Sequence, residues 1–213
     1  MDIQERLTAF AMLGAGWVLW LLVALSVLGL AVAIERIRFF WLTRCDVDEL
    51  AKDLENGIDG SAREALIQKL SGQASAEAAV VLAGLNGLAK GVASAEQSMA
   101  AAIRLARLRM SRSLTYLGTV GNNAPFVGLL GTVIGIVRAF AELERSQGQV
   151  TSGLMAEVGE ALVATAVGIL VALPAVALFN YFQRLVKMRI TQAQALADGL
   201  LAAAKSSPES EGD

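Results

Sequence analysis

The chain has 213 residues, of which 55% are hydrophobic and 18% are charged, and its mean hydropathy is +0.54. Soluble domains carry about 25% charged residues, so this composition indicates a membrane protein. The chain has no histidine and one cysteine, Cys45, which excludes a Ser-His-Asp triad, histidine-ligated metal sites and an intramolecular disulfide. The formal net charge of −2 gives no reason to expect nucleic acid as a partner.

Three stretches without a charged residue are long enough to be membrane spans: 7–34, 113–137 and 161–183. Each exceeds the roughly 20 apolar residues that a transmembrane helix needs. The first carries Trp17 and Trp20, which are typical interface anchors. A cleaved signal peptide is the alternative for this stretch. It is disfavoured because the preceding segment is not basic and the apolar run far exceeds about 15 residues.

The basic residues beside the spans predict the orientation of the chain. They gather after the first span, before the second and after the third, and are sparse elsewhere: Arg36, Arg38, Arg44, then Arg104, Arg107, Arg109, Arg112, then Arg184, Lys187, Arg189. Lysine and arginine mark the cytoplasmic side, so we expect the N-terminus outside and the C-terminus inside. The predicted organisation is as follows: a periplasmic start and first span (1–35), a cytoplasmic helical region (36–112), a second span (113–143), a short periplasmic linker (144–153), a third span (154–183), and a cytoplasmic helical extension with a disordered tail (184–213).

The cytoplasmic segments also read as helices, and no segment alternates with the period of a strand. Three pairs fit the spacing of a helix-capping box: Asp46 with Glu49, Ser61 with Glu64, and Ser94 with Gln97. Asn56-Gly57 is a predicted helix stop. We expect one uninterrupted helix over about 95–143, and a third-span helix that continues to about residue 200. The predicted fold is an all-α membrane protein with three spans, two of them extending far into the cytoplasm, assembled as a homo-oligomer.

Rows of small residues mark the second and third spans. Such rows let helix backbones approach closely, and helix packing alone explains them: Gly128, Gly131 and Gly135 in one span, Gly168 and Ala172 in the other. Each of these spans also holds one proline, Pro125 or Pro174, where we expect a kink.

Four polar residues lie in or beside these spans. Glu160 directly precedes the charge-free part of the third span, and it faces either a wet cavity or the interface. Glu157 lies one turn further out and is expected at an outer vestibule. Thr132 and Thr165 bond either their own backbone, as such threonines usually do, or a polar path through the membrane. A path of two hydroxyls and one carboxylate suits protons or water and has too few ligands for a selective metal site.

Two segments resemble a known family. GNNAPFVGLLGTVIGIVRAF (121–140) and GEALVATAVGILVALPAVALFNYF (159–182) resemble the second-span and third-span signatures of the ExbB/TolQ/MotA proton-channel family, and the short linker and modest loop resemble its ExbB and TolQ branch. The resemblance implies a stator subunit that forms a homopentamer around a dimeric single-span ExbD/TolR-like partner. It maps the proton path onto Thr132, Glu160 and Thr165, with Glu157 and Asn122-Asn123 as departures from the family pattern.

The resemblance further implies a bacterial inner-membrane location, no cofactor, and a periplasmic effector that is TonB-like or of another kind. Outer-membrane import, envelope maintenance and gliding all stay open as the energised process. A membrane scaffold without ion flux is the alternative function, because the small-residue rows alone hold an oligomer together. An enzyme is disfavoured, since no catalytic constellation is recognisable.

Overall fold

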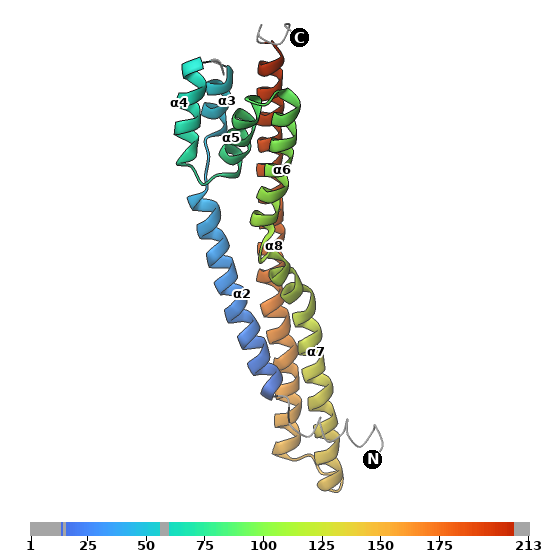
Figure 1. Ribbon diagram of the computed structural model, residues 1–213. Coiled ribbons are helices and arrows are strands. Elements are labelled where there is room, and N and C mark those ends of the chain that lie inside the picture. The colour runs from blue at the N-terminus through green and yellow to red at the C-terminus, as the bar shows by residue number, and fades with distance from the viewer. Residues whose placement is uncertain (1–13, 15, 56–59, 207–213) are drawn as a thin grey trace. The chain divides into compact units, whose positions relative to one another are not determined.

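The computed structural model describes residues 14, 16–55 and 60–206, and every element of regular secondary structure in these ranges is a helix (Figure 1). The predicted start of the chain, the stop at Asn56-Gly57 and the C-terminal tail lie outside the described residues. The helices are α2 (Gly16–Leu42), α3 (Val47–Glu55), α4 (Gly60–Ser71), α5 (Ala76–Leu88), α6 (Val92–Ser111), α7 (Leu114–Arg145) and α8 (Ser152–Ser206). Over these ranges the predicted all-α class is confirmed.

Three of the helices, α2, α7 and α8, are long and apolar enough to cross a membrane. Pro125 lies inside α7 and Pro174 inside α8, and both helices continue past their proline. The α8 helix has 55 residues, which at 1.5 Å per residue is about 80 Å and more than twice the thickness of a hydrocarbon core. The predicted continuation of the third-span helix to about residue 200 is therefore confirmed.

The expected uninterrupted helix over 95–143 is wrong. The α6 helix ends at Ser111, and α7 begins at Leu114. Between them Arg112 is extended, with a ψ of 139°, and Ser113 has a φ of 65°, in the left-handed region that a non-glycine residue rarely adopts. Helical periodicity and propensity carry no signal for such a break.

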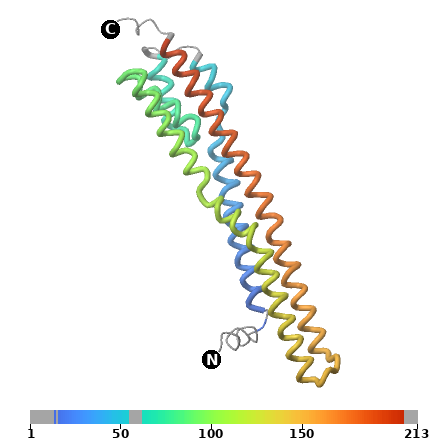
Figure 2. The backbone as a smooth tube through the Cα atoms, turned by 90° about the vertical axis from the view of Figure 1, so that its right-hand side faces the viewer, coloured from blue at the N-terminus to red at the C-terminus, as the bar shows by residue number. Residues whose placement is uncertain are grey.

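The chain divides into two compact units. The first comprises the described residues up to Ile34 together with 113–180, so it holds the first part of α2, all of α7 and most of α8. In it α7 and α8 form an antiparallel hairpin closed by a short turn (Figure 2). Its core is small and aliphatic: Val18, Leu22, Val120, Ala124, Ile134, Ala172 and Ala175.

The second unit comprises 35–112 and the chain from Tyr181 onward. Its larger core draws on α3, α4, α5, α6 and the last part of α8, with Leu70, Leu85 and Leu200 among the fully buried side chains. The predicted cap at Asp46 is confirmed, because Asp46 Oδ1 accepts the amide of Glu49 at 3.1 Å. The cap at Ser94 is wrong, since this serine lies inside α6, which begins at Val92, and the predicted cap at Ser61 depends on a side chain outside the described residues.

Candidate ion pathway at the α7–α8 interface

The backbones of α7 and α8 lie directly against each other at Gly128 and Gly168. A Cβ built on Gly128 would lie 2.7 Å from the carbonyl oxygen of Ala164 and 3.2 Å from the Cα of Gly168. A Cβ on Gly168 would lie 2.7 Å from the carbonyl oxygen of Ala124. No carbon atom fits at these distances, so only glycine allows the two backbones to touch here.

The contact continues toward the closed end of the hairpin in steps of three or four residues. A Cβ on Gly131 would lie 2.5 Å from the Cβ of Ala164, and one on Gly135 would overlap the Cβ of Ala161. Ala172 is also buried, on the other side of Gly168. The five small residues singled out in the sequence thus all lie at or beside this interface, and the spacing fixes the register of α8 against α7.

Both threonines bond to the same turn of α7. Thr165 of α8 donates its hydroxyl to the carbonyl oxygen of Gly128 across the interface, at 3.1 Å. Thr132 of α7 donates to the carbonyl oxygen of Leu129 in its own helix, at 2.6 Å. The two hydroxyls therefore donate to neighbouring carbonyl oxygens and not to each other. Each hydroxyl oxygen can still accept a hydrogen bond through its lone pairs.

Glu160 lies half-buried on α8, five residues before Thr165. Its Oε1 is 3.6 Å from the position that a Cβ would take on Gly16, the first residue of α2. Among the described residues Glu160 has no ion-pair or hydrogen-bond partner. Its carboxylate therefore lies beside the backbone of α2 at Gly16.

Glu157 is paired, unlike Glu160. Its Oε1 lies 2.7 Å from Nη2 of Arg138 on α7, and the exposed fractions of the two side chains are 19% and 30%. The same guanidinium lies against Gly14, where a Cβ would approach Nη1 to 2.5 Å. The pair continues the register of the glycine contacts by one more step toward the closed end of the hairpin.

The sequence analysis did not predict this pair, because Arg138 lies outside the predicted polar path. The signal was present: once α7 and α8 are placed antiparallel through Gly135 and Ala161, the next step of three or four residues along each helix reaches Arg138 and Glu157. The departures at Asn122 and Asn123 lie on an exposed face of α7, and Asn123 donates to the carbonyl oxygen of Thr119 at 2.8 Å. Within the described ranges no group of three or more acidic or cysteine side chains is placed to hold a metal ion.

Comparison with known proteins adds a family to this geometry. Residues 58–195 match the model of the MotA/TolQ/ExbB proton channel family, a range that includes α4 to α7 and most of α8 with Thr132, Glu160 and Thr165.

Individual relatives match over shorter segments. An ExbB-like biopolymer transport protein of Helicobacter pylori is 39% identical over 89 residues, or 42% of this chain and 59% of the relative. The biopolymer transport protein ExbB of Xanthomonas campestris is 39% identical over 89 residues, or 35% of its own length. The Tol-Pal system protein TolQ of Pseudomonas aeruginosa is 37% identical over 102 residues, or 48% of this chain and 44% of the relative. The matched segments thus span between 35% and 59% of the length of these relatives.

Proposed function

The chain belongs to the MotA/TolQ/ExbB proton channel family, and we propose that it is a proton-channel subunit of an ion-driven motor in the bacterial inner membrane. In this proposal protons pass along the α7–α8 interface, and their flow drives work in the cell envelope through a second membrane protein. The observation that carries the proposal is Glu160, a half-buried carboxylate without an ion-pair partner among the described residues, on the helix that also presents Thr165.

A proton path needs a group that exchanges protons and polar groups that pass them on. Glu160 supplies the first, and the hydroxyls of Thr165 and Thr132 supply the second. Glu157 is less suited to the first role because Arg138 holds it as an ion pair. In this account Glu157 lines the outer vestibule and fixes the hairpin, while Glu160 carries the proton.

The proposal includes a partner and a stoichiometry. Five copies surround a dimeric, single-span ExbD/TolR-like protein, whose own membrane carboxylate completes the path, and a TonB-like or other periplasmic effector receives the work. The N-terminus lies in the periplasm, and the second unit lies in the cytoplasm. One charge that crosses 100 mV supplies about 2.3 kcal/mol, so several protons drive each working stroke.

A non-conducting membrane scaffold is the second candidate, and one observation favours it. Both threonine hydroxyls already bond to carbonyls of α7, at 2.6 and 3.1 Å, so helix packing alone accounts for them. A scaffold has no use for an unpaired carboxylate, however, whereas a channel does.

The test is to purify the full chain together with the protein of the neighbouring gene and to count subunits by native mass spectrometry. The proposal expects five copies of this chain with two copies of a single-span protein that has one membrane aspartate. A monomer, or a complex without such a partner, contradicts it. A second measurement separates the channel from the scaffold, namely the envelope process that depends on the partner, followed in cells. If the chain is a channel subunit, this process stops when the membrane potential is collapsed, whereas a scaffold does not depend on the potential.

A further inference from the structure

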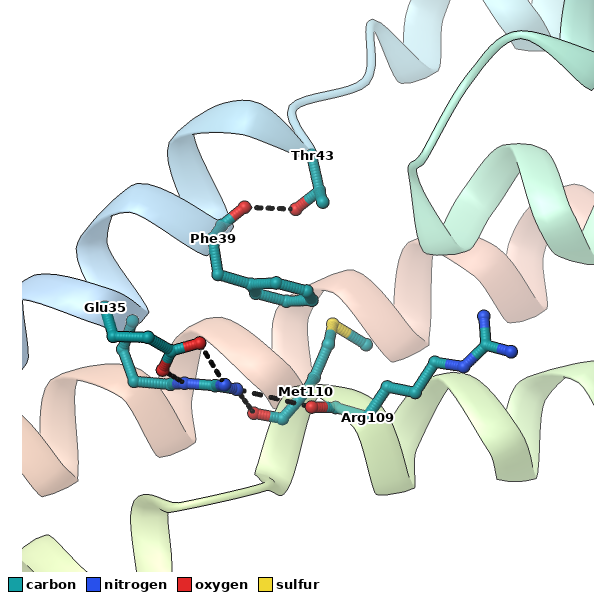
Figure 3. Close-up of polar contacts among 6 residues, drawn as sticks. Glu35, Phe39, Thr43, Arg109 and Met110 are labelled. Carbon is teal, nitrogen blue, oxygen red and sulfur yellow. Dashed lines mark hydrogen bonds and ion pairs between the residues drawn. The ribbon is translucent and has the colours of Figure 1, made fainter. Parts of the chain in front are cut away.

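Arg36 of α2 is a buried cation that the proposed proton path does not use. Arg36 is only 4% exposed. Its guanidinium donates to two backbone carbonyls of α6, the oxygen of Arg109 at 3.3 Å and that of Met110 at 3.4 Å (Figure 3). Glu35 holds the same guanidinium by an ion pair, with Nη2 donating to Oε1 at 2.6 Å. The ring of Phe39 lies under it, 5.0 Å from the guanidinium carbon.

These two carbonyls belong to the last turn of α6, directly before the break at Arg112 and Ser113. In an uninterrupted helix the carbonyl of Arg109 accepts the amide of Ser113, and the carbonyl of Met110 accepts the amide of Leu114. In the broken form the last carbonyls of a helix lack intrahelical partners, and a cation at this end stabilises them. Arg36 thus satisfies the same two acceptors that a continuous helix would satisfy with its own amides.

The sequence around the break favours the continuous form. No proline or glycine lies between residues 92 and 117, and alanine, leucine, arginine and methionine predominate there. Ser113 instead adopts a φ of 65°, which costs free energy in any residue other than glycine. Local preference and the observed break therefore oppose each other, and contacts from α2 offset the difference.

We propose that the α6–α7 junction is a two-state element, broken while the Arg36 guanidinium occupies the carbonyls of Arg109 and Met110 and continuous when it withdraws, and that this exchange regulates the motor. The regulatory half rests on the proposed function, because α7 carries Thr132 and the glycines that face α8. Glu35 and Phe39 favour the broken form, since they hold the guanidinium in place.

The test is hydrogen exchange of the full-length protein with its partner in lipid nanodiscs, read on peptides that cover residues 110–117. Arg36→Met removes the guanidinium, so the Ser113 and Leu114 amides should gain helical bonds and exchange at least about tenfold more slowly. Arg38→Met removes an exposed arginine two residues along the same helix and should leave this exchange unchanged. Faster exchange in Arg36→Met means that α6 only frays, and overturns the proposal.

Two further variants act on the same equilibrium without touching Arg36. Ser113→Ala keeps the penalty on the positive φ and raises the helix propensity, so it should slow the exchange as Arg36→Met does. Ser113→Gly removes the penalty, so it should keep the junction broken and restore rapid exchange in the Arg36→Met background. If Ser113→Ala and Ser113→Gly give the same exchange rates, the junction has only one state and the proposal fails.

The claim that the junction regulates the motor has its own measurement. It is the activity in cells that depends on both the partner and the membrane potential. Variants that shift the junction should change this activity at least about threefold, and Ser113→Gly should return Arg36→Met toward the wild-type value. If a variant changes the hydrogen exchange of residues 110–117 but leaves this activity unchanged, the claim of regulation is overturned. An inactive wild-type complex, in contrast, contradicts the proposed function and leaves the exchange result standing, because exchange is read without proton flow.

Discussion

In the first unit α7 and α8 approach until the backbones of Gly128 and Gly168 meet, whereas in the second unit leucine, valine and methionine side chains fill the space between helices. The ion pairs of the two units differ in burial. In the first unit the side chains of Arg138 and Glu157 are 30% and 19% exposed, whereas in the second unit those of Arg189 and Glu77 are 8% and 1% exposed. A membrane lacks the hydrophobic drive that packs helices in water, so the first unit relies on close backbone contact.

The buried pair of the second unit ties three helices together. Nε of Arg189 on α8 lies 3.2 Å from Oε1 of Glu77 on α5, and Nη1 donates to the hydroxyl of Thr43 at the end of α2, at 2.8 Å. Another nitrogen of the same guanidinium donates to the Thr43 carbonyl oxygen, which caps the C-terminus of α2. Cavities of about 530 and 390 Å³ both border this guanidinium.

The largest expected effect follows from removing this guanidinium. Arg189→Met leaves the Glu77 carboxylate, whose side chain is 1% exposed, without its cation, which costs about 3–5 kcal/mol of unfolding free energy. Thermal unfolding in detergent measures the loss, with Lys187→Met, an exposed cation of the same helix, as the control. Equal stability of the two variants would mean that the second unit does not depend on its buried pair.

The first unit should respond most to a single methyl group. Gly128→Ala forces a Cβ against the carbonyl oxygen of Ala164 and should cost about 1–3 kcal/mol. Gly159→Ala is the matched control, because nothing lies within 4 Å of its Cβ position. Alanine favours helix over glycine, so the control should be neutral or stabilising. A loss of the same sign in both variants, seen as a lower unfolding temperature, would contradict close backbone packing at Gly128.

A smaller effect is expected for the hydroxyl that joins α7 and α8. Thr165→Val keeps the shape and removes the bond to the Gly128 carbonyl, which should cost about 0.6–1.7 kcal/mol. Thr119→Val, which removes a bond within one helix only, is the control. The difference between the two melting temperatures measures the interhelical bond, and no difference would assign Thr165 to function alone.

The smallest expected effect is a pH dependence of the second unit. Burial raises the pKa of the Glu77 carboxyl above its ordinary value of 4.5. The folded state then binds a proton more readily than the unfolded state, so between 4.5 and the raised pKa the unfolding free energy contributed by Glu77 increases as the pH falls. Glu77→Gln should remove this dependence from a series of melting curves. A contribution that instead decreases on acidification would contradict the burial of an ionised Glu77.

The sequence predicted the features that depend on composition and period. The three apolar runs correspond to three helices that are long and apolar enough to cross a membrane, and the small residues of the second and third runs lie where α7 and α8 meet. It did not predict the pair Arg189–Glu77, because long-range partners leave no local pattern, and the pair Arg138–Glu157 follows only once the register of α7 against α8 is known. The break at Ser113 was not predicted either, since the side chain that contacts the last turn of α6, Arg36, lies far away in sequence.

Proton flux tests the central proposal most directly. The complex with its partner is reconstituted in liposomes with an imposed membrane potential, and internal acidification is followed by a pH-sensitive dye. We predict that Glu160→Gln assembles normally and lowers the flux by at least about tenfold, a loss within the usual range for removing a proton-transfer group. Glu144→Gln, at an exposed position near the end of α7, should keep the wild-type flux. Undiminished flux through Glu160→Gln would contradict the account.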